Sequence, residues 1–256
     1  MVASQDTTPQ NPAIPARAGL GGLLAIPSWV LLSLLRRPTV WIWLGLLSAF
    51  WPALVKFSEL GLTTDQATPQ AALYELCFVS LLVGAFVGTS LLDKHQALFL
   101  RAAPNRRLGA EALGLASACI PFLIAALAPA LAYGAGTHDL GFADLPARCL
   151  LAGAHMVAVA MVLLHLPLGT TARRAILPFA VWLLPATVPP ESALSPWIHR
   201  VLGIAQRLTP DGVLNSGGGR EVGDWAGWLL TTLGWVLLAW LTARAQPRNH
   251  AIRDPR

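Results

Sequence analysis

The chain has 256 residues, of which 55% are hydrophobic and only 12% charged, whereas a soluble globular domain typically carries about 25% charged residues. This composition excludes a soluble enzyme, a disordered chain and a collagen-like fibre, and the formal net charge of +5 is scattered between apolar runs rather than gathered into a nucleic-acid-binding patch. A bilayer-spanning helix needs roughly 20 apolar residues, so the length suits a polytopic membrane protein and leaves no room for a separate soluble domain.

The N-terminal region divides into a polar tail and an apolar segment. Residues 1–17 are polar and contain several prolines, which predicts a disordered tail. Residues 18–37 hold an apolar run bracketed by Arg17 and by Arg36 and Arg37, and no small-residue cleavage site marks it as a signal peptide. We predict an interfacial amphipathic helix here, because a spanning helix would place the two basic groups on opposite sides of the membrane.

Six apolar segments follow, and each predicts a membrane span. Several contain proline, which is tolerated in a span where neighbouring helices or water satisfy the freed backbone carbonyls. We therefore expect kinked helices that pack against one another. The predicted spans cover residues 39–55, 71–92, 108–135, 149–168, 175–188 and 225–243.

The basic residues predict the orientation of these spans. With the N-terminus inside, 13 of the 18 Lys and Arg residues lie on the cytoplasmic side, as the positive-inside rule requires. Both termini are then cytoplasmic, and residues 244–256 form a basic tail. The five basic residues left on the outer side are Lys56, Arg148, Arg200, Arg207 and Arg220.

The segment between the second and third spans carries the most informative pattern. Asp93 precedes a short run whose apolar residues, with the stem of Arg101, can share one helical face. A proline and two arginines follow. This pattern resembles the loop of type-2 ABC exporter permeases (the ABC-2 family), in which an acidic, amphipathic coupling helix runs into a Leu-Leu-x-x-Pro-x-x-Arg motif. The residues that match the motif are Leu98, Leu100, Pro104 and Arg107, while His95 and Gln96 stand where the family often has Gly-Thr.

The resemblance extends to the whole architecture. It implies an all-α polytopic membrane protein with six transmembrane helices, an interfacial elbow helix before them and cytoplasmic termini. It also implies a re-entrant helical segment between helices five and six. Here that segment would cover residues 189–208 and end at Leu208-Thr209-Pro210, where the family often shows Asn-Pro.

The resemblance implies the permease subunit of an ATP-binding cassette exporter in a bacterial inner membrane. Residues 93–103 would dock on a separate cytoplasmic ATPase that holds ATP and Mg, and a second permease copy or a paralogue would complete the pathway. No G-x-x-x-x-G-K-[ST] motif occurs in the sequence, and we expect no catalytic, cofactor-binding or metal-binding residue and no nucleic-acid partner. An ordinary basic loop remains the alternative for residues 93–107.

Two other functions stay open. A membrane scaffold or assembly subunit with no transport of its own would need no ATPase partner. An intramembrane enzyme would require polar groups such as Glu75, His155 and His165 to meet in one cavity, although we expect the histidines to be packing residues.

A few residues within the spans have local interpretations. Gly84 and Gly88 form a G-x-x-x-G pair that either lets two helices approach closely or arises by chance. Glu111 is expected to pair with Arg107 at i, i+4, and Asp224 is expected to cap the last span. The three cysteines, which form no C-x-x-C pair, are expected to be packing residues: Cys77, Cys119 and Cys149.

Overall fold

The computed structural model describes residues 20–59, 69–102, 107–137, 145–178, 196–197, 209–215 and 222–245. Within these ranges the secondary structure is helical and contains no strand. Its helices are α1 (Leu20–Leu35), α2 (Pro38–Glu59), α3 (Pro69–Ala102), α4 (Arg107–Thr137), α5 (Leu145–His165), α6 (Thr170–Pro178), α9 (Pro210–Asn215) and α10 (Val222–Ala245).

Among the described residues, four helices are long and apolar enough to cross a membrane, which confirms the all-helical, membrane-type part of the prediction. A fifth crossing is counted only if the bent pair formed by α1 and α2 is treated as one span. The four segments are Leu73–His95, Leu108–Ala132, Leu145–His165 and Trp225–Ala245.

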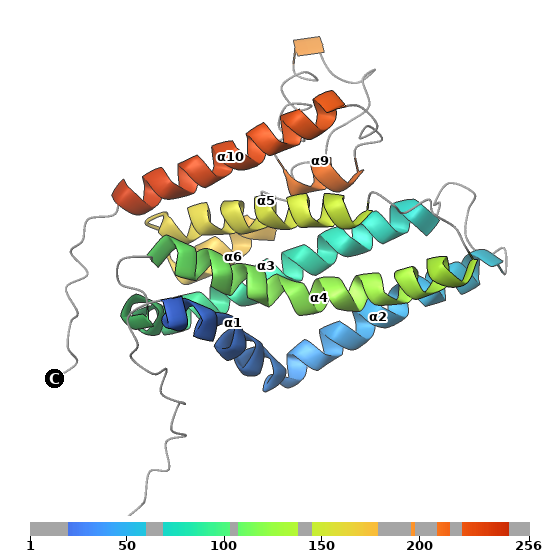
Figure 1. Cartoon of the computed structure of the whole chain (residues 1–256), viewed down its shortest axis with the longest axis horizontal. Helices are drawn as coiled ribbons and strands as arrows, with labels where there is room; N and C mark the ends of the chain where they lie inside the picture. Colours follow the sequence, from blue (N-terminus) through green and yellow to red (C-terminus); the bar gives the residue numbers. More distant parts are fainter. Residues whose placement is uncertain are drawn as a thin grey trace, which may run out of the picture.

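The helices form a bundle in which α3 and α4 lie side by side at the centre (Figure 1). Helix α5 packs against both of them, α10 lies along the outer side of α5, and α2 covers the opposite side against α4 and α3. The core sits where α3, α4 and α5 meet. Its largest fully buried side chains there include Phe78, Leu81, Leu115, Phe122 and Met156.

Helices α1 and α2 meet at a sharp corner. The segments Ala25–Leu35 and Pro38–Ala53 are inclined by 88° to one another. The residue before a proline is disfavoured in helical conformation, so α1 ends ahead of Pro38, which then begins α2 as a first-turn proline. The Trp41 indole donates a hydrogen bond of 2.8 Å to the Leu35 carbonyl, which satisfies an acceptor left free at the end of α1.

The faces of α1 differ from the predicted amphipathic pattern. Ile26, Val30 and Leu34 are buried, as an inward face requires, but Leu32 and Leu35 are exposed on the outer face. The reason lies in composition, since serines are the only polar side chains between residues 25 and 35. Helix α1 therefore presents apolar surface on both sides.

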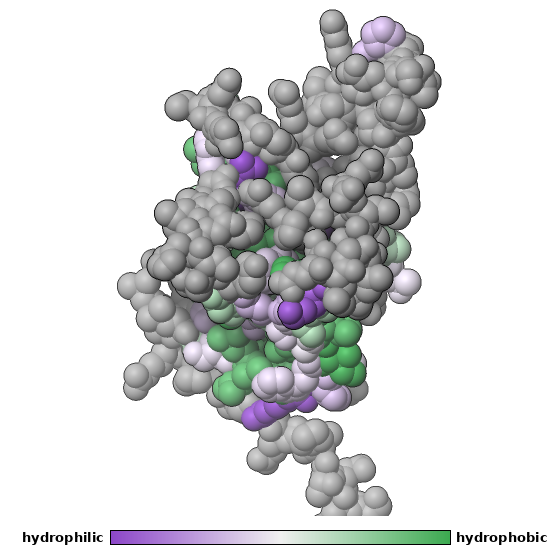
Figure 2. Space-filling view, turned by 90° about the vertical axis from the view of Figure 1, so that its right-hand side faces the viewer, coloured by the Kyte–Doolittle hydropathy of each residue, from purple (hydrophilic) through white to green (hydrophobic). Residues whose placement is uncertain are grey.

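The outer surface of the bundle is also apolar. Only 17% of the apolar stretch of α10 is buried inside the bundle, whereas 67% of the apolar stretch of α5 is buried. Figure 2 looks at the bundle from one end, and green apolar patches outnumber the few separate purple hydrophilic ones among its coloured residues. A surface of this kind suits a lipid environment, where apolar side chains face hydrocarbon.

Several helices begin or end a few residues away from the predicted boundaries, for local reasons. Helix α5 ends at His165 rather than at 168, because Pro167 cannot continue a helix. Helix α6 begins at Thr170, so Arg173 and Arg174 lie in a helix instead of a loop. Helix α10 begins at Val222, which places Asp224 inside the helix and not at its cap.

Other predictions fall outside the described residues. These are the N-terminal tail, all but two residues of the predicted re-entrant segment 189–208, most of the fifth span, and the C-terminal tail beyond residue 245. The described part resumes at Thr209, where α9 packs against α5 and α3 with Val213 and Leu214 fully buried.

Candidate functional site at the polar end of the bundle

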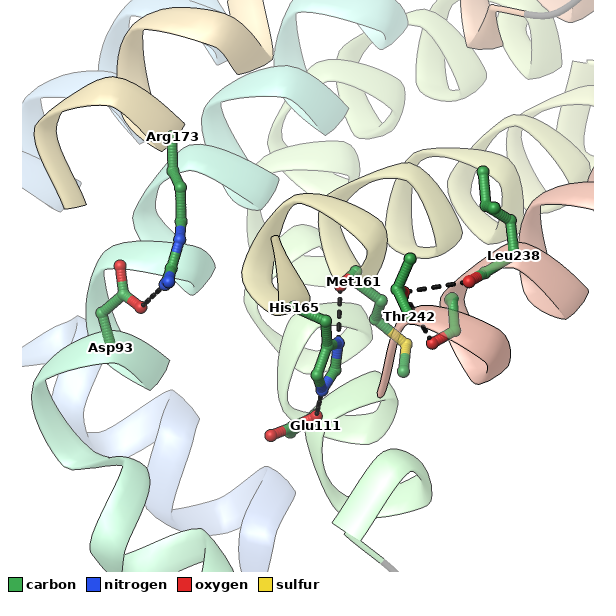
Figure 3. A network of polar contacts seen from close by, with 8 residues as sticks. Asp93, Glu111, Met161, His165, Arg173, Leu238 and Thr242 are labelled. Atoms are coloured by element: carbon green, nitrogen blue, oxygen red, sulfur yellow. Dashed lines mark hydrogen bonds and ion pairs between the residues drawn. The ribbon is translucent and has the colours of Figure 1, made fainter. Parts of the chain in front are cut away.

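Charged side chains from four helices gather at one end of the bundle, where α3 and α5 end and α4 and α6 begin. We call this the polar end and define it by Asp93, Glu111, His165 and Arg173. These residues form two pairs that lie close together (Figure 3). The first pair joins α3 to α6, and the second joins the consecutive helices α4 and α5.

The first pair connects α3 to α6. Arg173 donates a hydrogen bond of 2.8 Å from Nη1 to Oδ1 of Asp93, and Nη2 donates a second, of 3.1 Å, to the Leu166 carbonyl in the turn before α6. The contact between the side chains uses one carboxylate oxygen, because Asp93 Oδ2 and Arg173 Nε have no hydrogen-bond partner among the described residues. A contact through one hydrogen bond is weaker and easier to rearrange than a bidentate contact through two parallel hydrogen bonds.

The second pair connects α4 to α5 and is almost completely buried. His165 Nε2 lies 3.0 Å from Oε2 of Glu111, while its Nδ1 lies 2.7 Å from the Met161 carbonyl. A carbonyl oxygen can only accept, so Nδ1 must carry a hydrogen. Nε2 then faces a carboxyl oxygen of Glu111, so a close polar contact joins the two helices.

Helix α3 is interrupted at this same end. His95 has a non-helical backbone (φ −121°, ψ 23°), so two helices meet there. The short piece after the break is seen end-on in Figure 1, next to α1, while the rest of α3 runs across the view. The ring of Trp29 in α1 lies edge-on to the His95 ring, with centroids 5.1 Å apart. The segment that the sequence analysis assigns to coupling is thus a separate helical piece beside α1.

The remaining coupling residues are only partly placed. Leu98, Leu100 and Arg101 lie in the helical piece after the break, and their side chains are outside the described part. Pro104 lies outside it entirely, and Arg107 is the first residue of α4. Among the predicted coupling residues, the structure places the side chains of Asp93 and His95, both at the polar end.

The two glycines of the G-x-x-x-G pair face α4. A Cβ built on Gly84 would lie 2.5 Å from Cα of Cys119, and one on Gly88 would lie 3.0 Å from Cβ of Ala118. Backbone approach this close requires a residue without a side chain. In this chain the glycines serve contact between two of its own helices.

Sequence reasoning missed one buried cation. Arg148, counted among the outer loop residues, lies in the first turn of α5 and is only 6% exposed. Its guanidinium lies 5.5 Å from the ring centroids of both Tyr74 and Trp228 and donates a 3.4 Å hydrogen bond to the Leu214 carbonyl of α9. Charge counting treats every Arg alike, so only the fold reveals that this one joins four helices.

Sequence reasoning also missed the partner of Glu111. Arg107 lies one turn away, but its side chain is outside the described part, and the contact that the structure places is with His165. The two histidines of α5 are ten residues apart, about 15 Å along the helix, and His155 lies 3.5 Å from the Thr232 hydroxyl of α10. Glu75 is exposed. The structure does not bring these three residues into one cavity.

Comparisons with protein-family models, with curated proteins and with solved structures found no match to this chain. The fold therefore defines its class directly. The part of the chain that the structure describes is all-helical, with four helices long and apolar enough to cross a membrane and two polar pairs at one end of the bundle.

Proposed function

We propose that this chain is the permease subunit of an ATP-binding cassette exporter of the ABC-2 type. A separate cytoplasmic ATPase would bind at the polar end of the bundle, and a second permease copy or a paralogue would complete the pathway. ATP-driven closure of the ATPase pair would then move the spans and expose the substrate on the outer side of the bacterial inner membrane.

The break in α3 is the observation that carries this proposal. A lever needs a short rigid element that can move relative to the span and still pull on it. The break at His95 separates residues 96–102 from the span, and the chain stays helical on both sides of it. A plain basic loop would require no helical piece at this position.

The polar pairs support the same proposal by linking the lever to the bundle. Asp93 stands two residues before the break and bonds to Arg173 of α6. Glu111 and His165 join the start of α4 to the end of α5. A force on residues 96–102 would therefore reach α6 through the contact between Asp93 and Arg173.

The corner between α1 and α2 also supports it. If α2 crosses the membrane, an angle of 88° lays α1 close to the membrane plane, as an elbow helix requires. The contact between Trp29 and His95 then places this elbow beside the break in α3.

Affinity purification from the native membrane tests the proposal. We expect the tagged chain to retain a nucleotide-binding subunit in stoichiometric amount, detected by mass spectrometry and by ATPase activity. Leu98→Asp and Arg101→Asp should each remove that subunit, because a carboxylate on the docking face would have to be desolvated without a partner. The matched control is Lys56→Asp, in the last turn of α2 and at the end of the bundle opposite to the proposed docking site. This variant should retain the subunit.

Two results would contradict the permease proposal. A chain that purifies under gentle conditions without any ATPase favours the scaffold function instead. If Lys56→Asp loses the ATPase as completely as Leu98→Asp does, the docking site is not at residues 93–103.

A further inference from the structure

A groove of about 400 Å³ runs along one side of the bundle, between the start of α2, the second half of α3 and the end of α6. Most of its wall is apolar, with Trp43, Leu82 and Phe86 among the larger side chains. The volume lies within the range of about 300–1,000 Å³ found for small-molecule sites.

One end of the groove is polar and positive. Arg37 and Ser90 line it there, and the Arg37 side chain is only partly exposed. The charges of Arg37 and Lys94 both act on the nearby ring of His95. Arg37 also precedes the first turn of α2, whose positive dipole end favours a negative group.

The length of the groove matches one leaflet of a bilayer. The lining residues of α3 run from Leu82 to Ser90, a rise of about 12 Å along a helix. Leu82 lies near the middle of the apolar segment Leu73–His95, and Ser90 lies near its end. The groove therefore extends from the rim of the hydrocarbon core to about its midplane, and half of that core is about 15 Å thick.

We propose that this groove binds one anionic phospholipid, with the phosphate at Arg37 and an acyl chain along Trp43, Val87 and Phe86. A cation at one end and an apolar wall one leaflet deep match the two parts of a lipid. Basic pockets between helices commonly hold anionic head groups. If a second copy of the chain occupied the groove instead, a cation at the rim would not be needed, and the groove would not have to end near the midplane of the bilayer. The inference does not depend on an ATPase partner.

Native mass spectrometry of the purified chain tests this site. In micelles titrated with phosphatidylglycerol, we expect one lipid bound per chain, and about fivefold weaker binding after Arg37→Gln, as expected for one basic residue near an anionic lipid surface. Arg37→Lys should keep most of the binding. The matched control is Arg36→Gln, which removes an exposed neighbouring charge that does not line the groove.

A second variant tests the apolar wall. Val87→Trp fills the groove without changing charge and should also remove the bound lipid, with unfolding followed by circular dichroism to show that the bundle persists. Equal binding of phosphatidylglycerol and phosphatidylethanolamine would overturn the proposal. So would an equal loss from Arg36→Gln and Arg37→Gln, or a wild-type chain that binds no lipid and dimerises through this face.

Discussion

At the residue scale, the pair formed by Glu111 and His165 is the most consequential contact. Both side chains are almost fully buried, at 4% and 2% exposure, where an uncompensated charge is costly. The contact of Nε2 with Glu111 and the bond from Nδ1 to Met161 give both ring nitrogens of His165 a polar neighbour. Removing one member has a different effect from removing both.

A double-mutant cycle tests this. His165→Leu should lower the free energy of unfolding by about 3–5 kcal/mol, because it leaves a buried carboxyl group without its partner. Glu111→Gln should change it little, since the amide can donate to an unprotonated Nε2. Changing both residues to Leu should recover most of the loss. The measurement is unfolding by detergent titration in micelles, and additive effects of the two substitutions would contradict the pairing.

At the scale of the element, close contact between α3 and α4 depends on two glycines. An added Cβ on Gly84 meets backbone, which cannot give way without moving the helix. An added Cβ on Gly88 meets side-chain atoms of Ala118 and Leu115, at 3.0 and 3.1 Å. The two positions therefore differ in how easily their surroundings can adjust.

A series of alanine substitutions separates these cases. Gly84→Ala should lower stability by about 1–3 kcal/mol, the usual cost of overpacking, and Gly88→Ala by less. Gly45→Ala, in α2 with nothing within 4 Å of its added Cβ, should be neutral or raise stability by up to about 1 kcal/mol, because alanine favours a helix over glycine. Thermal unfolding in micelles gives the order, and equal losses at positions 45 and 84 would refute the close contact.

At the scale of the whole molecule, charged side chains gather at one end of the bundle, whereas apolar side chains cover its outer sides. The charged network and the groove cation lie at one end, where Asp93, Arg173 and Arg37 stand. Apolar side chains cover the outer sides of α2 and α10. By the positive-inside rule, we expect the polar end to face the cytoplasm.

Cysteine labelling tests that orientation. The three native cysteines are buried, so an introduced cysteine should dominate the signal. Lys56→Cys should react with a membrane-impermeant maleimide in intact cells, and Lys94→Cys only after permeabilisation. Both lysines are exposed and lie near opposite ends of the bundle. The reverse pattern would invert the topology.

The sequence by itself determined the class of this protein and the positions of its long helices. Apolar runs of sufficient length must be helical in a membrane, where every backbone polar group needs an internal partner. The four helices that are long and apolar enough to cross a membrane each lie within a few residues of a predicted span. Proline also set local limits, at Pro38 and at Pro167.

Only the tertiary structure decided which polar residues meet. Sequence reasoning paired Glu111 with a residue one turn away, because only near neighbours on a helix can be inferred from spacing. Three residues have partners on other helices, far away in the chain. His165 contacts Glu111 across 54 residues, Arg173 contacts Asp93 across 80, and Arg148 contacts Leu214 across 66. Such contacts depend on how whole helices pack, and packing is set by the shapes of buried surfaces that no local pattern records.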